Sequence, residues 1–219
     1  MKKNFSIGEN IRFGMGRTLK NFWFFALFIS VLFIGTALFS FFDNYQIPGI
    51  LGLSLDFIIS ASSFLATYVI FMAILKIALE LTQSEKINLK EVNELLPLFV
   101  KFTLTTLLYW AIVLIGMVFL IVPGIIFMIK YQFASLIILD EEGVGIREAL
   151  YKSNLLASGV QWKLFWFSMV SDFLNFAGLI FFMVGFIITG PTTIIAKARI
   201  YKELKRQVKG RKKTVFLQD

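Results

Sequence analysis

The chain has 219 residues, of which 58% are hydrophobic and only 16% are charged, and its mean hydropathy is +0.78. An average soluble domain is about 45–50% apolar and about 25% charged, so the composition argues against a soluble globular domain. Because the chain has no Cys and no His, it offers no disulfide, no Cys or His metal ligand, and no Ser-His or Cys-His catalytic pair. We therefore expect a protein that is not an enzyme and that binds no cofactor or metal.

Six apolar segments predict an all-α, polytopic integral membrane protein, because about 20 apolar residues cross a bilayer as one helix. We expect the six transmembrane helices to pair as three hairpins. Pro-Gly pairs at 48–49 and 123–124 mark two outer turns, since proline is tolerated at a helix start. The break between the last two spans is the least defined. The expected spans are 22–42, 50–77, 98–121, 124–139, 163–182 and 185–201, all within a single membrane domain over 1–205.

Two further segments predict amphipathic helices at the cytoplasmic surface of the membrane. The first covers residues 1–21 and opens with Ser6-x-x-Glu9, a capping-box pattern. Its apolar side chains recur every four residues, which predicts a face that rests on the membrane; they are Ile7, Ile11, Met15 and Leu19. The second follows the acidic residues 140–142 and ends near Gly159. Residues 206–219 are expected to form a basic cytoplasmic tail.

The basic residues predict the orientation in the membrane. All but one of the 22 Lys and Arg residues fall before the first span, around the connections after the second and fourth spans, or at the C-terminal end. The expected outer turns contain none. Because cytoplasmic loops are enriched in Lys and Arg, we expect both the N-terminus and the C-terminus in the cytoplasm. An even number of spans likewise places both termini on the same side of the membrane.

The net charge of +8 allows two classes of partner. Basic segments bind nucleic acid through its phosphates, but no groove-reading module accompanies this charge, so we expect no nucleic acid. The anionic inner leaflet attracts basic residues, by about 1 kcal/mol for each one near the surface. We expect membrane lipids as partners, with headgroup contacts from Arg12, Arg17, Lys20, Lys205, Arg206 and Arg211.

Three charged residues fall inside the expected spans, where they are costly and usually pair. Helical rise places Lys130 about 9 Å and Asp56 about 10 Å below the outer edge, and Asp172 about 14 Å above the inner edge. We hypothesise that Lys130 forms a buried ion pair or network with one or both aspartates. The pair would either fix helix packing or belong to a substrate or proton path, unless shifted span boundaries leave these groups in water.

Several segments of the chain form a recognisable pattern. The most specific is Val122-Pro-Gly followed by Lys130-Tyr131. The others are Lys76-Ile-Ala-Leu-Glu-Leu, Leu139-Asp-Glu, Glu148-Ala-Leu-Tyr-Lys-Ser-Asn, Gln161-Trp-Lys-Leu-Phe and Ala198-Arg-Ile-Tyr-Lys-Glu-Leu. Together they resemble an uncharacterised prokaryotic group of six-helix proteins, the YciC-like proteins and the membrane domain attached to some glycerophosphodiester phosphodiesterases. The chain departs from the pattern at Asn154-Leu-Leu-Ala-Ser-Gly. The resemblance implies a fold and a multi-pass location in a prokaryotic plasma membrane, and it supplies no catalytic residues.

Two functions follow from these features as expectations. The first is a non-enzymatic scaffold or accessory subunit, whose basic cytoplasmic face binds partner proteins, a second copy of the chain or anionic lipid. The alternative is a transporter or channel component for a small solute or lipid, which would use Lys130, Asp56 and Asp172. A lipid-acting intramembrane enzyme ranks last, because it would need a centre built without His or Cys.

Overall fold

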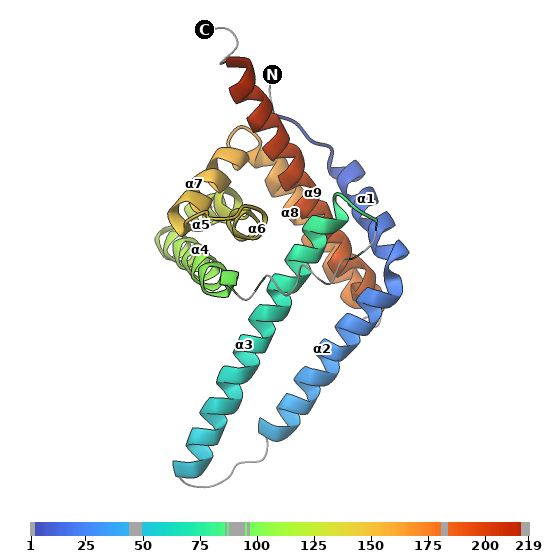
Figure 1. Ribbon diagram of the computed structural model, residues 1–219, viewed down its shortest axis with the longest axis vertical. Helices are drawn as coiled ribbons and strands as arrows, with labels where there is room; N and C mark the ends of the chain where they lie inside the picture. The colour runs from blue at the N-terminus through green and yellow to red at the C-terminus, as the bar shows by residue number, and fades with distance from the viewer. Residues whose placement is uncertain are drawn as a thin grey trace.

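In the computed structural model, the described residues are 3–43, 50–85, 87, 95, 97–180 and 184–215. Every regular element in these ranges is a helix, as predicted. The helices are α1 (Ile7–Lys20), α2 (Phe22–Asp43), α3 (Ile50–Leu81), α4 (Phe99–Phe119), α5 (Ile121–Tyr131), α6 (Ala134–Asp140), α7 (Ile146–Ala157), α8 (Gln161–Ile180) and α9 (Val184–Val215). In Figure 1, α2 and α3 extend away from the other helices, while the start of α1 and the end of α9 lie at the opposite end.

Among the described residues, three stretches are long and apolar enough to cross a membrane. They are Ser60–Leu81 in α3, Phe99–Phe119, which is α4, and Ile121–Asp140, which covers α5 and α6. The described part of α2 contributes a shorter apolar helix, Phe22–Val31. These lengths and compositions support a helical membrane protein and coincide with three of the six expected spans.

The buried core lies near the charged end of the molecule, where α3, α6 and α9 meet. The short helix α6 is almost fully enclosed, with residues 136–139 all buried. Its neighbours contribute Met72 and Ile77 from α3 and Ile195 and Ile200 from α9, each at most 2% exposed. This apolar centre fixes the position of Asp140, the last residue of α6.

Helix α1 begins at the expected capping residue, since the Ser6 Oγ accepts a hydrogen bond from the Glu9 N–H at 3.4 Å. The face of α1 that packs against α9 is not the apolar line. It is the line of Asn10, Gly14 and Thr18, all buried. A Cβ atom on Gly14 would lie 2.3 Å from the main-chain oxygen of Thr192. Small residues allow this close approach. Of the apolar line, Ile7 and Ile11 pack partly buried against the core, and Met15 and Leu19 are about half exposed.

The expected fourth span over 124–139 is two helices in the structure. The helix is interrupted by a turn at residues 132–133, between α5 and α6. Ser153 of α7 bridges the break, because its hydroxyl donates to the Lys130 main-chain oxygen at 2.9 Å and accepts from the Phe133 N–H at 3.1 Å. A buried side chain from another helix thus replaces main-chain hydrogen bonds that one continuous helix would make.

The turn before this span also differs from the expectation. Leu120 alone, in an extended conformation, separates α4 from α5, so Pro123 falls in the first turn of α5, where it displaces no main-chain hydrogen bond. The two helices pack closely near the turn. A Cβ on Gly116 would lie 3.0 Å from the Gly124 Cα. Of the other expected outer turns, the one around Pro48 lies outside the described residues.

Helix α8 ends at Ile180 and α9 begins at Val184, so the expected break between the last two spans falls at residues 181–183, outside the described residues. The two helices contact each other closely, because a Cβ on Gly185 would lie 2.6 Å from the Gly178 main-chain oxygen. Helix α9 then runs for 32 residues with Pro191 inside it. It therefore continues through residues 206–215, which the sequence assigned to a tail.

Candidate functional site

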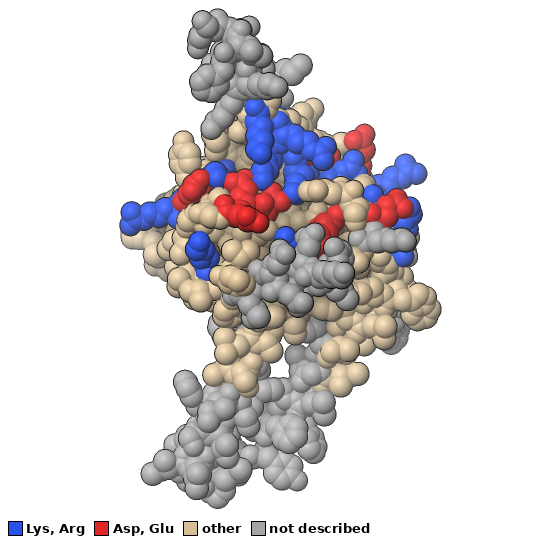
Figure 2. Space-filling view, in the orientation of Figure 1, with Lys and Arg blue, Asp and Glu red and all other residues tan. Residues whose placement is uncertain are grey.

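The charged residues gather at the end of the molecule that carries the second half of α9. Figure 2 shows Lys and Arg side chains over this end, with acidic side chains next to them, while the described surface of the α2–α3 arm shows none. The distribution agrees with the expected one-sided placement of the basic residues. We therefore take this charged end as the candidate site.

Asp140 is the centre of a network between α6 and α9. Its carboxylate accepts hydrogen bonds from the Tyr201 hydroxyl, at 2.9 Å, and from the ammonium groups of Lys202 and Lys205. The Asp140 side chain is only 11% exposed, so these charges interact in a region with little water. An ion pair in such a place is stronger than one on the open surface.

Glu141 extends the network to α7. It pairs with Lys205 at 2.8 Å and with Lys152 at 2.7 Å, and Lys152 also pairs with Glu148 at 2.7 Å. Burial opposes the ionisation of Glu141, but the hydrogen bonds from Lys152 and Lys205 outweigh it and hold the pKa of Glu141 below its usual value. The network therefore stays charged at neutral pH and ties three helices together.

Lys202 and Lys205 also line a cavity of about 530 Å³. Its lining comes from two short segments. Thr82 and Gln83 follow the end of α3, and the remaining lining residues are Lys202, Lys205, Arg206 and Lys209 of α9. Spacings of three, four and seven residues place these four cations on one face of the helix. The cavity is thus lined by basic and neutral polar side chains.

The segment before α1 connects α7, α8 and α9. Lys3 donates to main-chain carbonyls at the end of α7, including that of Ser158 at 3.0 Å, where a cation also favours the helix dipole. The Asn4 main chain and the Gln207 side chain exchange two hydrogen bonds, of 3.0 and 2.7 Å. Lys163 donates to the Asn4 side chain. This segment therefore holds the charged ends of three helices together.

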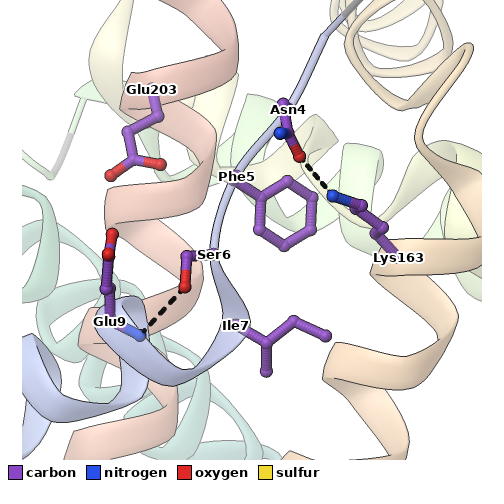
Figure 3. Close-up of a pocket in the computed structure, with 7 residues that line it drawn as sticks. All are labelled: Asn4, Phe5, Ser6, Ile7, Glu9, Lys163 and Glu203. Atoms are coloured by element: carbon purple, nitrogen blue, oxygen red, sulfur yellow. Dashed lines mark hydrogen bonds between the residues drawn. The ribbon is translucent and has the colours of Figure 1, made fainter.

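Figure 3 shows a second cavity, of about 670 Å³, beside this segment. The carboxylates of Glu9 and Glu203 lie on one side of the view and Lys163 on the other. Glu203 already pairs with Arg199 at 3.2 Å and accepts a hydrogen bond from Asn10 at 3.3 Å. Charges of both signs line this cavity, and Glu203 is already paired. The lining therefore does not favour an anionic ligand.

Two of the residues expected to contact lipid take part in internal contacts. Arg17 and Lys20 pair with Glu85 at 2.7 and 2.9 Å. The Arg17 side chain is only 15% exposed, and its guanidinium lies 5.0 Å from the centre of the Phe13 ring. Arg199 lies 4.0 Å from the centre of the same ring. Arg17 therefore joins α1 to its neighbours as well as contributing positive charge.

The other expected lipid contacts fall into three groups. Arg12 and Arg206 are exposed. Lys205 lines the basic cavity and is held by Asp140 and Glu141. The Arg211 side chain lies outside the described residues. The structure thus brings Lys205 and Arg206 into one cavity and leaves Arg12 outside it.

The three expected intramembrane charges are not brought together among the described side chains. Lys130 is half-buried near the end of α5, and the ion pairs found in the described part of the chain do not include it. Asp172 is exposed on α8, and its charge attracts Lys197 of α9. Asp56 lies in α3, but its side chain is outside those described. The pairing of Lys130 with Asp56 stays a prediction.

Sequence reasoning did not single out Asp140, Lys202 or Lys209. The sequence contains a signal for the two lysines, since the basic residues at 202, 205, 206 and 209 follow the helical repeat. It contains no local signal for their pairing with Asp140, which lies about 60 residues earlier in the chain and reaches them only through the fold.

Comparison of the chain with models of protein families, with curated proteins and with solved structures finds no match. The resemblance to the YciC-like group therefore stays a prediction.

Proposed function

We propose that the chain is a non-enzymatic, multi-pass membrane protein that acts as a scaffold or accessory subunit, and whose basic cytoplasmic face binds anionic lipid. One observation carries the proposal, namely that basic side chains gather at one end of the molecule, while large apolar side chains are exposed over much of the remaining described surface. A soluble monomer rarely exposes apolar patches larger than a few hundred Å². A lipid environment gives that apolar surface a favourable place.

Helix α8 supports this proposal most directly. One of its faces exposes an apolar stripe whose members recur every three or four residues; they are Trp162, Trp166, Met169, Phe173, Phe176 and Ile180. The stripe is about 27 Å long, close to the hydrocarbon thickness of a bilayer, about 30 Å. Trp162 is 76% exposed at the end near the basic residues, where tryptophans lie in membrane proteins. In this proposal α8 spans the bilayer.

The tip formed by α4 and α5 supports the same orientation. Val118, Phe119 and Ile121 are between 72% and 84% exposed around the turn at Leu120. No side chain in the described part of the chain covers them. In the proposed arrangement they lie in lipid, with both termini of the chain in the cytoplasm of a prokaryotic cell.

The natural absence of Cys allows a direct topology test. Single cysteines would be placed at Gln83 and Asn44 and labelled in intact cells with a membrane-impermeant maleimide, before and after permeabilisation. We expect Asn44→Cys to react in intact cells and Gln83→Cys only after permeabilisation. The reverse pattern, or equal labelling of both, would contradict the proposed orientation.

Binding of anionic lipid and binding of a partner protein are both tested on the purified full chain. Mass spectrometry of the detergent-extracted protein would identify lipids and proteins that remain bound. We expect anionic phospholipid to be enriched over zwitterionic phospholipid relative to the host membrane. A stoichiometric protein partner without lipid enrichment would replace the lipid proposal with the partner-binding alternative.

A further inference from the structure

The basic cavity has a stronger charge imbalance than the rest of the charged end. Four cations line it, and Asp140 and Glu141 pair with only two of them, Lys202 and Lys205. Within the described part of the chain, no carboxylate lies within ion-pair distance of Arg206 or Lys209. Among the described residues, two positive charges therefore have no acidic partner, and they lie beside a space large enough for a small ligand.

The acidic residues position two of the cations and do not fill the cavity. Lys202 and Lys205 are 14% and 17% exposed, and the Asp140 carboxylate fixes both ammonium groups. A preorganised cation loses little side-chain freedom when it binds a ligand. Arg206 and Lys209 are exposed and can close over the ligand from the solvent side.

The position of the cavity relative to the apolar helices narrows the class of ligand. Thr82 and Gln83 follow directly after Leu81, the last residue of a stretch long enough to cross a membrane. In the proposed orientation this is the level at which the phosphates of the inner leaflet lie. Basic cavities between helices at this level are a known way of binding lipid headgroups.

The chemistry of the lining favours a phosphate monoester over a diester. A monoester carries about −1.5 to −2 charges near pH 7, which matches the two unpartnered cations, whereas a diester carries only one. The Arg206 guanidinium can bind two phosphate oxygens through paired N–H groups. The lysines contribute further charged donors, and the Gln83 amide contributes a neutral one.

We propose that the cavity between the end of α3 and the basic face of α9 binds a phosphate monoester group, with Lys202, Lys205, Arg206 and Lys209 as its cationic ligands. This inference depends on the proposed function for its lipid source, because a monoester at the inner leaflet is the headgroup of phosphatidic acid. The same chemistry would accept inorganic phosphate from solution, and the experiment separates the two sources.

The test uses the full chain, purified in a zwitterionic detergent and freed of bound lipid, with binding measured by native mass spectrometry. The probes are phosphatidic acid, phosphatidylglycerol and phosphatidylcholine with identical acyl chains. The site variant is Arg206→Gln with Lys209→Gln. The matched control is Arg147→Gln with Lys101→Gln, because these two residues are also exposed and lie outside the cavity. Both double variants remove one Arg and one Lys.

We expect the wild-type chain to bind phosphatidic acid at least about tenfold more tightly than phosphatidylglycerol, from the second phosphate charge and the added charge-assisted hydrogen bonds. The site variant should lose this preference, and the control should keep it. Competition by inorganic phosphate at concentrations comparable to the lipid would assign the site to a soluble phosphate. Competition only at far higher concentrations would assign it to the lipid.

Two results would overturn the inference. In the first, the control loses the preference as fully as the site variant, which means that only general surface charge is involved. In the second, the wild-type chain has no preference for the monoester. Either result leaves the proposed function standing if phosphatidylglycerol still binds above phosphatidylcholine. If neither anionic lipid binds above phosphatidylcholine, the lipid-binding function fails as well. Equal thermal unfolding of all variants would show that folding is unaffected.

Discussion

Replacing Asp140 by Asn tests whether the network between α6 and α9 stabilises the fold. The substitution keeps the shape of the side chain and the acceptor for the Tyr201 hydroxyl, but it removes the charge that faces Lys202 and Lys205. Both lysines are less than one fifth exposed, so their ammonium groups would stay in a region with little water and without their main partner.

The expected loss of stability follows from this burial. Breaking a buried ion pair by removing one partner costs about 3–5 kcal/mol. Glu141 still holds Lys205 at 2.8 Å, and some water reaches both lysines, so we expect a loss of about 2–3 kcal/mol, below that range. The measurement is a denaturant titration of the detergent-purified chain, followed by tryptophan fluorescence and by circular dichroism.

A matched control and a double variant make the result decisive. Glu85→Gln removes the common partner of Arg17 and Lys20 at a carboxylate that is 62% exposed, and it should destabilise far less. Asp140→Asn combined with Lys202→Met should show coupling, since the two residues are in contact. If Asp140→Asn costs no more than Glu85→Gln, or if the double variant is purely additive, the network does not stabilise the fold as argued.

The remaining predictions concern other contacts. Gly14→Ala should destabilise the chain by about 1–3 kcal/mol through overpacking against α9, whereas Gly16→Ala, with open space around it, should be neutral or stabilise α1 slightly; the same titrations compare them. Lys3→Ala should increase amide hydrogen exchange in the last turn of α7 without affecting the start of that helix. Glu141→Gln should flatten the pH dependence of stability below pH 4.5. The pKa of Glu141 in the folded chain is lowered from its ordinary 4.5. In this pH range the Glu141 carboxylate therefore binds more protons in the unfolded chain than in the folded one, and the stability that it contributes is lost as the pH falls. Ser153→Ala should destabilise the chain by about 1–3 kcal/mol, because it leaves two buried main-chain groups unsatisfied. An unchanged unfolding curve for Gly14→Ala or Ser153→Ala, uniform exchange after Lys3→Ala, or an unaltered pH profile for Glu141→Gln would contradict the corresponding argument.

The sequence predicted best what local chemistry determines. The helix that starts after Ser6 and the end of α7 before Gly159 follow from capping and from the left-handed conformation at glycine, where φ is +83°. In each case the residues that decide the structure lie within a few positions of the feature itself.

The features that the sequence did not predict depend on residues far apart in the chain. At the break at residues 132–133, the hydrogen-bond partner is Ser153, about 20 residues later in the chain. Helical periodicity through 124–139 therefore did not predict the break. The packed face of α1 was hidden for a different reason. Hydrophobic periodicity emphasised the apolar line, whereas close packing on α9 selected the small residues Gly14 and Thr18. Likewise, the hydrogen bonds of Asp140 to Tyr201, Lys202 and Lys205 form only because the fold brings α9 next to α6.

The continuity of α9 has a mechanical consequence. A helix of 32 residues is about 48 Å long, and rigid elements of this kind carry displacements between distant sites. The cations around the basic cavity and the glycine contact with α8 are near opposite ends of this one rod. Pro191 removes one main-chain hydrogen bond close to the α8 end, so bending concentrates there. A ligand that pulls on Arg206 would therefore tilt the part of α9 that follows Pro191, while the contact between Gly178 and Gly185, which lies before the bend, would stay in place.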